Sequence, residues 1–238
     1  MENTNNAGFS ARYSAAMREF FAGVKDELPI LVGVIPFGMI YGILALGAGL
    51  STTDAQVMSA VVFAGSAQFM LVQLAGLGTP ALVMILTGFV INLRHALYSA
   101  SVAPHTRHLS APWKAMLAYL LTDEAYAVTI THYNKDSDSR LKHWYFLGAG
   151  LALWSSWQLS SAVGIFLGAQ VPPSWSLDFT LALTFIALVV PALEDRASVL
   201  SAVAAGITAL LAISLPYKLG LLVAALAGII IGLWSEQR

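Results

Sequence analysis

Apolar runs of about 20 residues follow one another along most of this 238-residue chain, and they limit its fold more than any other feature. Hydrophobic residues make up 58% of the chain and charged residues only 11%, with a mean hydropathy of +0.73. Ordinary soluble domains carry about 25% charged residues. A soluble core cannot hide so many long apolar runs, so the bilayer is the solvent that the sequence indicates. We therefore predict an all-α, polytopic integral membrane protein.

Hydropathy along the chain predicts eight transmembrane spans, with seven as the alternative, and some of them kinked or discontinuous. The segment 178–194 is short, and the last two spans are separated only by "LPYK", so any of these can be re-entrant or tilted. We divide the chain into an N-terminal lead-in, 1–27, and a single transmembrane domain, 28–234. The predicted spans are 28–50, 56–77, 80–103, 113–133, 144–170, 178–194, 197–215 and 217–234.

The distribution of Lys and Arg among the connecting segments predicts the orientation of the chain. Cytoplasmic loops are enriched in these residues. With a cytoplasmic N-terminus, eight spans place eight basic residues inside and three outside. The inner set is Arg12, Arg18, Lys25, Lys135, Arg140, Lys142, Arg196 and Arg238, and the outer set is Arg107, Lys114 and Lys218.

Composition also excludes several classes of protein. A net charge of −1 without a Lys/Arg cluster argues against nucleic-acid binding. The absence of Cys removes disulfides, thiolate catalysis and Cys-based metal sites, and we expect no metal and no cofactor. The lead-in 1–27 carries charges but no apolar core, so we interpret it as a cytoplasmic segment and not as a cleaved signal peptide.

The third predicted span, "TGFVINLRHALYSASVAP", carries Asn92, Arg94 and His95 within an apolar run. An unpaired Arg near the bilayer centre costs about 3 kcal/mol or more. Helical spacing places Asn92, His95 and Ser99 on one face, and Arg94, Tyr98 and Ser101 on the adjoining face. Either these residues anchor the outer end of the bundle, or they form part of a functional site.

The fourth predicted span contains two acids, Asp123 and Glu124, that can neutralise Arg94. An ion pair with one of them would lower the cost of placing both charges in the membrane. The second acid, or His95, could then take up and release a proton. The alternative is a purely structural salt bridge.

Small and polar residues interrupt the remaining spans. Pro36 in the first span predicts a kink or break, and Gly33, Gly38 and Gly42 predict close approach of another helix. Gln68 in the second span is either interhelical glue or a substrate ligand. The fifth span places Trp157 and Gln158 among serines, which suggests a polar and aromatic cavity wall.

Five successive segments resemble those of the AzlC family, the large subunits of bacterial branched-chain amino-acid exporters. The segments are "GVIPFGMIYG", "VVFAGSAQFM", "GFVINLRHALYSASVAPH", "LTDEAYAVT" and "LDFTLALTFIALVVP". The resemblance extends from about residue 20 to residue 234. It implies a multi-pass inner-membrane protein that works with a small AzlD-type subunit and exports valine and related amino acids by secondary transport.

Chemistry suggests residues for such a site. We expect Arg94, or the group Asn92, Ser66 and Gln68, to bind the substrate carboxylate, with Gln158 nearby. Asp123 or Glu124 would bind the ammonium group or, with His95, the coupling proton. Phe37, Phe63, Phe69 and Trp157 are candidates for an apolar wall. A membrane-embedded enzyme is the first alternative, but no hydrolase or phosphate-binding motif is present. A channel or scaffold subunit that does not transport is the second.

Overall fold

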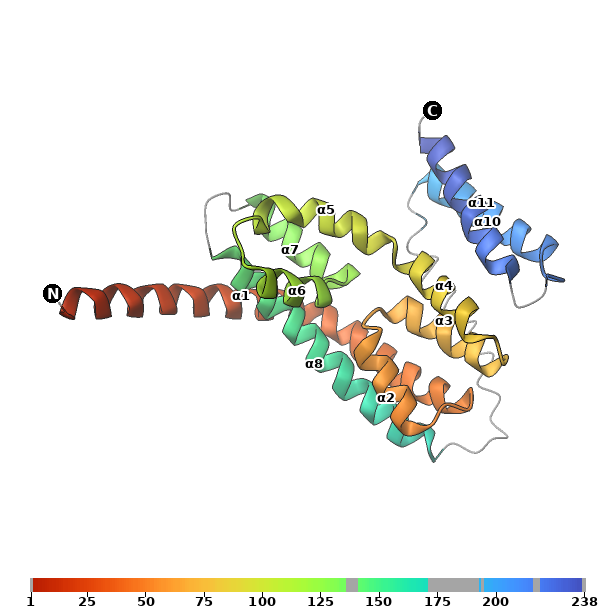
Figure 1. Cartoon of the computed structure of the whole chain (residues 1–238), viewed down its shortest axis with the longest axis horizontal. Coiled ribbons are helices and arrows are strands. Elements are labelled where there is room, and N and C mark those ends of the chain that lie inside the picture. The colour runs from red at the N-terminus through yellow and green to blue at the C-terminus, as the bar shows by residue number, and fades with distance from the viewer. Residues whose placement is uncertain (1, 136–140, 171–192, 194, 216–218, 237–238) are drawn as a thin grey trace.

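The computed structural model describes residues 2–135, 141–170, 193, 195–215 and 219–236, and this part of the chain contains helices and no strand (Figure 1). The all-α prediction is therefore confirmed for the described residues. The helices are α1 (Glu2–Gly47), α2 (Thr52–Val61), α3 (Gly65–Gly76), α4 (Ala81–Asn92), α5 (Arg94–Thr106), α6 (Ala111–Tyr119), α7 (Asp123–Lys135), α8 (Lys142–Gly168), α10 (Arg196–Leu211) and α11 (Leu219–Glu236).

The most extensive helix contact joins α1 and α8, two long uninterrupted helices. Glycines allow their backbones to touch. A Cβ atom added at Gly38 would lie 2.0 Å from Ser160 Oγ, and one added at Gly42 would lie 2.4 Å from the Ile165 nitrogen. The close packing expected at Gly38 and Gly42 is thus confirmed, since only a residue without a side chain fits there. The same expectation for Gly33 is wrong, because a Cβ atom there would meet nothing within 4 Å.

The break expected at Pro36 does not occur. Helix α1 continues through Pro29 and Pro36 to Gly47, although each proline removes one backbone hydrogen bond. Packing against α8 on both sides of Pro36 supports the helix where that bond is lost. The helix also continues without interruption from the predicted lead-in into the first predicted span, so the division at residue 27 stays a prediction.

Three helix pairs in the middle of the chain are broken. Each pair occupies one of the predicted spans 56–77, 80–103 and 113–133. The break between α2 and α3 covers residues 62–64, and that between α6 and α7 covers residues 120–122. Helices α4 and α5 meet at Leu93 with a bend of 41°. Discontinuity was predicted, but in the first span, whereas the structure places it in the next three.

The eight predicted spans are not confirmed. Among the described residues, two helical stretches are long and apolar enough to cross a membrane, Tyr13–Gly47 and Leu219–Glu236, and the bent pair α4–α5 would make a third. Helix breaks at 62–64 and 120–122 shorten two of the expected crossings. The predicted span 178–194 lies outside the described residues.

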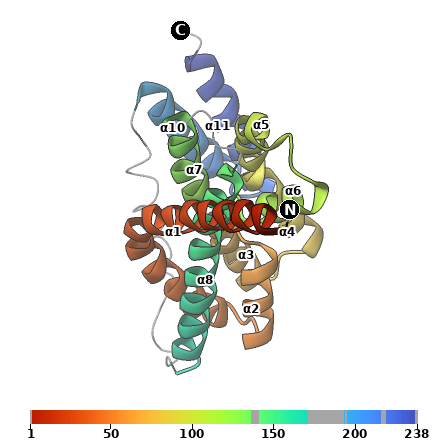
Figure 2. The same cartoon turned by 90° about the vertical axis from the view of Figure 1, so that its left-hand side faces the viewer.

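Helices α10 and α11 form a separate antiparallel pair beside α4 (Figures 1 and 2). They pack through small residues, and the Ser201 hydroxyl donates a hydrogen bond of 2.8 Å to the Gly228 carbonyl. Their outer faces expose Leu, Ile and Val side chains, as expected for helices that face lipid.

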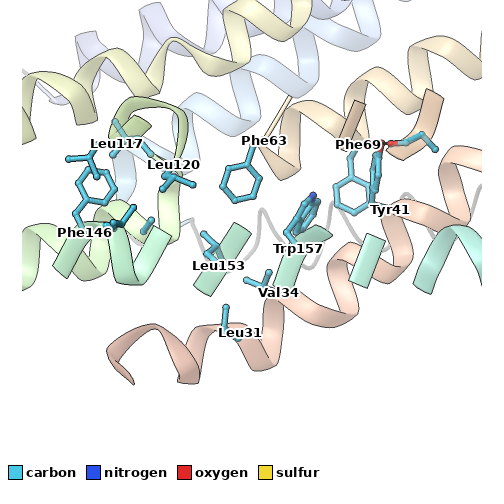
Figure 3. Close-up of a cluster of buried hydrophobic side chains, with 14 of the residues drawn as sticks. Leu31, Val34, Tyr41, Phe63, Phe69, Leu117, Leu120, Phe146, Leu153 and Trp157 are labelled. Carbon is cyan, nitrogen blue, oxygen red and sulfur yellow. Dashed lines mark hydrogen bonds between the residues drawn. The ribbon is translucent and has the colours of Figure 1, made fainter. Parts of the chain in front are cut away.

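The buried core lies between α1, α8 and the broken pairs (Figure 3). Leu31 and Val34 of α1, together with Leu153 and Trp157 of α8, point toward Phe63 and Phe69. This core includes Phe63 of the first break and Leu120 and Leu121 of the third, and so fixes these two breaks relative to α8.

Candidate functional site

A cavity of about 300 Å³ lies where the three broken helix pairs meet. Each break contributes to its wall, so the cavity exists because three helices stop at the same place. Backbone that leaves helical geometry at such a point can present its N–H and C=O groups to a ligand. The lining residues are Val61, Val62, Phe63 and Ala64 from the first break, Asn92 and His95 from the second, and Ala118, Tyr119 and Leu121 from the third.

Arg94, the first residue of α5, pairs with Asp123, the first residue of α7. The guanidinium Nη2 lies 2.9 Å from the Asp123 carboxylate and also donates a hydrogen bond to the Ser66 hydroxyl on α3. The ion pair expected from the sequence is therefore present, and it connects all three breaks. The two side chains are 33% and 39% exposed, so the pair is reachable from outside the protein.

Two tyrosines extend this polar group along α5 and α7. The Tyr98 hydroxyl donates to the second oxygen of Asp123 at 2.8 Å, and Tyr126 donates to Ser101 at 3.0 Å. The two rings stack at 4.4 Å between centroids. The face predicted for Arg94, Tyr98 and Ser101 is thus the face of α5 that contacts α7, and both oxygens of Asp123 are occupied.

Asn92 and His95 carry buried polar atoms that have no partner among the described residues. These atoms are Asn92 Oδ1 and His95 Nε2, and Arg94 Nε is in the same condition. Because buried polar groups in native proteins are nearly always bonded, unpaired atoms beside a cavity suggest that a ligand or water completes them. The predicted site residues Asn92 and His95 therefore lie in the cavity wall, and each has one polar atom free to bond a ligand.

Gln68 holds the first break together. Its amide nitrogen donates to the Ser59 carbonyl at 3.1 Å and also to the Val62 carbonyl, and its oxygen accepts from Trp157 Nε1 at 3.1 Å. The side chain is fully buried, and its two donated bonds add to those that the Ser59 and Val62 carbonyls accept from Gln158 and from the Ala64 N–H. Of the two roles predicted for Gln68, the structure favours interhelical glue.

Gln158 lies in a second polar group, between α2 and α8. Its amide nitrogen donates to the Ser59 carbonyl at 3.0 Å, and its oxygen accepts from Gln56 at 2.8 Å. A bond of 3.0 Å between the Ser59 and Ser161 hydroxyls completes the group. Gln158 is not among the residues that line the cavity, so the structure does not bring it together with Arg94.

The aromatic candidates are divided between core and cavity. Phe63 lines the cavity. Phe69 and Trp157 pack instead against Tyr41, and Phe37 packs against Phe69, with ring centroids about 6 Å apart in each pair. Only Phe63 of the four is thus placed to contact a ligand in the cavity.

Glu124 follows Asp123 in the first turn of α7, where the helix dipole favours negative charge. The charge of Glu124 acts on another acid, Glu27 of α1. Glu27 was not predicted as a site residue, because it is the last residue of the segment assigned to the lead-in. The available signal was an acid placed directly before an apolar run.

Tyr119 and Tyr126 were also not predicted. Tyr119 lines the cavity and donates to the Ala60 carbonyl at 2.6 Å, next to the first break. Tyr126 lies one turn after Asp123, a spacing that places both side chains on the same face of α7.

No group of His, Cys, Asp or Glu residues suited to a metal ion occurs within the described ranges.

These features define an all-helical membrane protein with discontinuous helices around a polar cavity. Comparison with known proteins agrees: the family model described as "AzlC protein" matches residues 29–171, which is more than half of the chain. The chain belongs to the AzlC family.

Three relatives illustrate the range of the family. The chain is 28% identical to the inner membrane protein YgaZ of Escherichia coli, over 90% of this chain and 87% of that protein. It is 31% identical to an uncharacterized membrane protein of Archaeoglobus fulgidus, over 92% and 96%. It is 28% identical to the branched-chain amino acid transport protein AzlC of Bacillus subtilis, over 73% and 66%. No solved structure matches the chain.

Proposed function

We propose that this chain is the large subunit of a secondary transporter that exports branched-chain amino acids such as valine. The name of the Bacillus subtilis relative supports the substrate class. The observation that carries the proposal is the cavity at the meeting point of three helix breaks, with unpaired polar atoms in its wall. Secondary transporters commonly bind substrates at such discontinuities.

The cavity wall and the Arg94–Asp123 pair next to it in the chain together offer groups that suit the three parts of a branched-chain amino acid. Asn92, His95 and the Arg94 guanidinium can donate to the carboxylate. Asp123 can accept from the ammonium group, in exchange for one of its present partners. Valines, Phe63 and Leu121 supply an apolar surface for the aliphatic side chain.

The start of α3 adds a further anion-binding element. Its N-cap residue, Ala64, lines the cavity, and no side chain caps the helix. The free N–H groups and the dipole of a helix N-terminus favour a carboxylate. Ser66 in this first turn already contacts Arg94, so the two carboxylate-binding elements are adjacent.

We propose further that transport is outward and proton-coupled, and that it requires a small AzlD-type membrane subunit. The N-terminus would be cytoplasmic, as the Lys and Arg distribution predicts, in a bacterial inner membrane. Transport is preferred over catalysis because the cavity groups include no nucleophile paired with a base and because the substrate chemistry above requires binding alone.

Efflux of labelled valine from proteoliposomes tests the proposal, with the chain reconstituted together with any small membrane protein that co-purifies with it. We expect Arg94→Ala and Asp123→Asn each to lower transport about 10- to 100-fold, because a charge-assisted hydrogen bond contributes about 1.5–3 kcal/mol.

Arg107→Ala is the matched control, since Arg107 is an exposed arginine at the end of α5 and should transport normally. Full transport by both cavity variants would refute the assigned site. Absence of valine flux in the unmodified protein would refute the function.

A further inference from the structure

Glu27 is a carboxylic acid sealed inside the helix bundle. Its side chain is 0% exposed, and neither carboxylate oxygen has a hydrogen-bond partner among the described residues. The preceding acid shows the contrast, because Asp26 accepts a hydrogen bond of 2.7 Å from the Tyr145 hydroxyl. Glu27 is therefore an unsatisfied group that the packing of α1 has buried.

The groups that face Glu27 do not offer it a positive charge. From α7 the neighbour is Glu124, which is itself acidic, and from α8 it is Tyr145, whose hydroxyl already serves Asp26. Further along α1, Glu19 lies 3.3 Å from His132, which stacks on Tyr145. Arg94, whose charge acts on Glu124, is engaged with Asp123 and Ser66.

A buried carboxylate without a cation or a hydrogen-bond donor is prohibitively costly, so the stable form of such a group is the neutral acid. A metal cation is a poor substitute for the proton here, because Na⁺, Mg²⁺ or Ca²⁺ requires several oxygen ligands. Among the described residues, no group of three or more His, Cys, Asp or Glu side chains is placed to hold a metal ion.

We propose that Glu27 is the site that takes up and releases the coupling proton, and that Glu124 connects it to the Arg94–Asp123 pair. This inference rests on the proposed function. Protonation gives a neutral acid, which suits the sealed position seen in the structure. Loss of the proton to water leaves a carboxylate, which must be hydrated or meet a cation, and so requires α1 and α7 to move apart.

The connection to the substrate cavity is short. Glu124 and Asp123 are consecutive residues in the first turn of α7, and Asp123 holds Arg94 at the cavity. A substrate ammonium group that displaces Arg94 from Asp123 would alter the charge next to Glu124, and through it the charge next to Glu27. The charge of Glu124 already acts on Glu27. Such interactions between charges are stronger in a medium of low dielectric constant than in water.

Glu27→Gln tests the proposal, because glutamine imitates the protonated acid and cannot titrate. In proteoliposomes we expect valine counterflow, which needs no net proton movement, to stay within about 3-fold of the unmodified protein. Valine transport driven by a pH gradient, and the proton flux that accompanies it, should fall at least about 10-fold, which corresponds to 1.4 kcal/mol. Asp26→Asn is the matched control and should keep both activities.

A second measurement does not depend on transport. Infrared spectra of the purified protein should contain the carbonyl band of a protonated carboxylic acid, and this band should lose intensity in Glu27→Gln but not in Asp26→Asn. Glu27→Asp keeps an acid at this position, and we expect it to retain both the band and gradient-driven transport, so the test stands even if the glutamine variant does not fold.

Gradient-driven transport in Glu27→Gln at the level of the unmodified protein would overturn the proposal, as would an unchanged infrared band. The failure of the proposed function has a different signature, namely no valine counterflow in the unmodified protein. In that case the coupling role falls with the function, and the infrared band alone decides whether Glu27 holds a proton.

Discussion

The two halves of the helix bundle solve the problem of packing in opposite ways. Helices α1 and α8 are continuous, and at their glycines the backbone of one helix packs directly against the other. The three broken pairs, α2–α3, α4–α5 and α6–α7, meet through polar side chains around a cavity. The closely packed helices and the helices around the cavity are therefore separate, and the hydrogen bond from Trp157 on α8 to Gln68 on α3 joins them.

The largest expected effect concerns the continuous pair. A Cβ atom at Gly164 would lie 2.1 Å from the Met39 carbonyl oxygen, so Gly164→Val must push α1 and α8 apart. We expect a loss of about 3 kcal/mol or more, because overpacking against backbone cannot relax easily. Thermal unfolding followed by size-exclusion chromatography measures this loss.

Gly33→Ala is the control for that experiment. Gly33 lies on the same helix, but a Cβ atom there would meet nothing within 4 Å. Alanine has the higher helix propensity, so stability should stay the same or rise by up to about 1 kcal/mol. Equal damage from both substitutions would show that α1 and α8 do not pack through their glycines.

The next effect concerns the residue that joins the two halves. Gln68→Leu removes the donor for the Ser59 and Val62 carbonyls and the acceptor for Trp157. We expect a loss of about 2 kcal/mol, since the buried Trp157 N–H is left without its acceptor, and a buried group left unpaired costs about 1–3 kcal/mol. The Ser59 and Val62 carbonyls keep their bonds from Gln158 and from the Ala64 N–H. The same unfolding assay measures it, and an unchanged midpoint would remove Gln68 from its role at the break.

A smaller effect is expected at the ion pair that connects the breaks. Arg94→Gln leaves Asp123 with Tyr98 alone and should cost about 1–2 kcal/mol. This loss of stability lies between the losses expected for breaking an exposed and a buried ion pair, because both side chains are about one-third exposed. Adding Asp123→Asn should recover part of the loss. Strict additivity of the two single substitutions in a double-mutant cycle would mean that the pair has no mutual stabilisation.

The smallest effect is expected for Tyr98→Phe, which removes one hydrogen bond to Asp123 and keeps the stack on Tyr126. We expect a loss of about 1 kcal/mol in stability. Valine transport should be affected more clearly than stability, because Asp123 loses a partner that fixes its orientation. Tyr126→Phe, which removes a bond to Ser101 instead, is the comparison.

Part of this site could be read from the sequence. An arginine within an apolar run requires a counter-charge, and the acids of the next predicted span were the available ones, so an ion pair of Arg94 with Asp123 or Glu124 was predicted, and the structure has it with Asp123. The approach of the helix backbones at Gly38 and Gly42 was predictable for a similar reason, since glycines one turn apart in an apolar helix form a surface for another backbone.

The positions of the breaks could not be read in this way. Pro36 predicted a break that is absent, and the real breaks at residues 62–64 and 120–122 contain no proline. A helix with a proline survives when its neighbours support it, and a helix without one stops when side chains such as Gln68 satisfy its last carbonyls. Both outcomes depend on partners that are distant in sequence.

By itself, the sequence determined the solvent of this protein, its helical class and the need to neutralise Arg94, because hydropathy and charge act locally and do not depend on register. Only the tertiary structure decided where the helices stop, that three stops coincide at one cavity, and that Glu27 belongs to the interior and not to a solvated lead-in. Burial and hydrogen-bond satisfaction are properties of several helices together, and no single segment carries them.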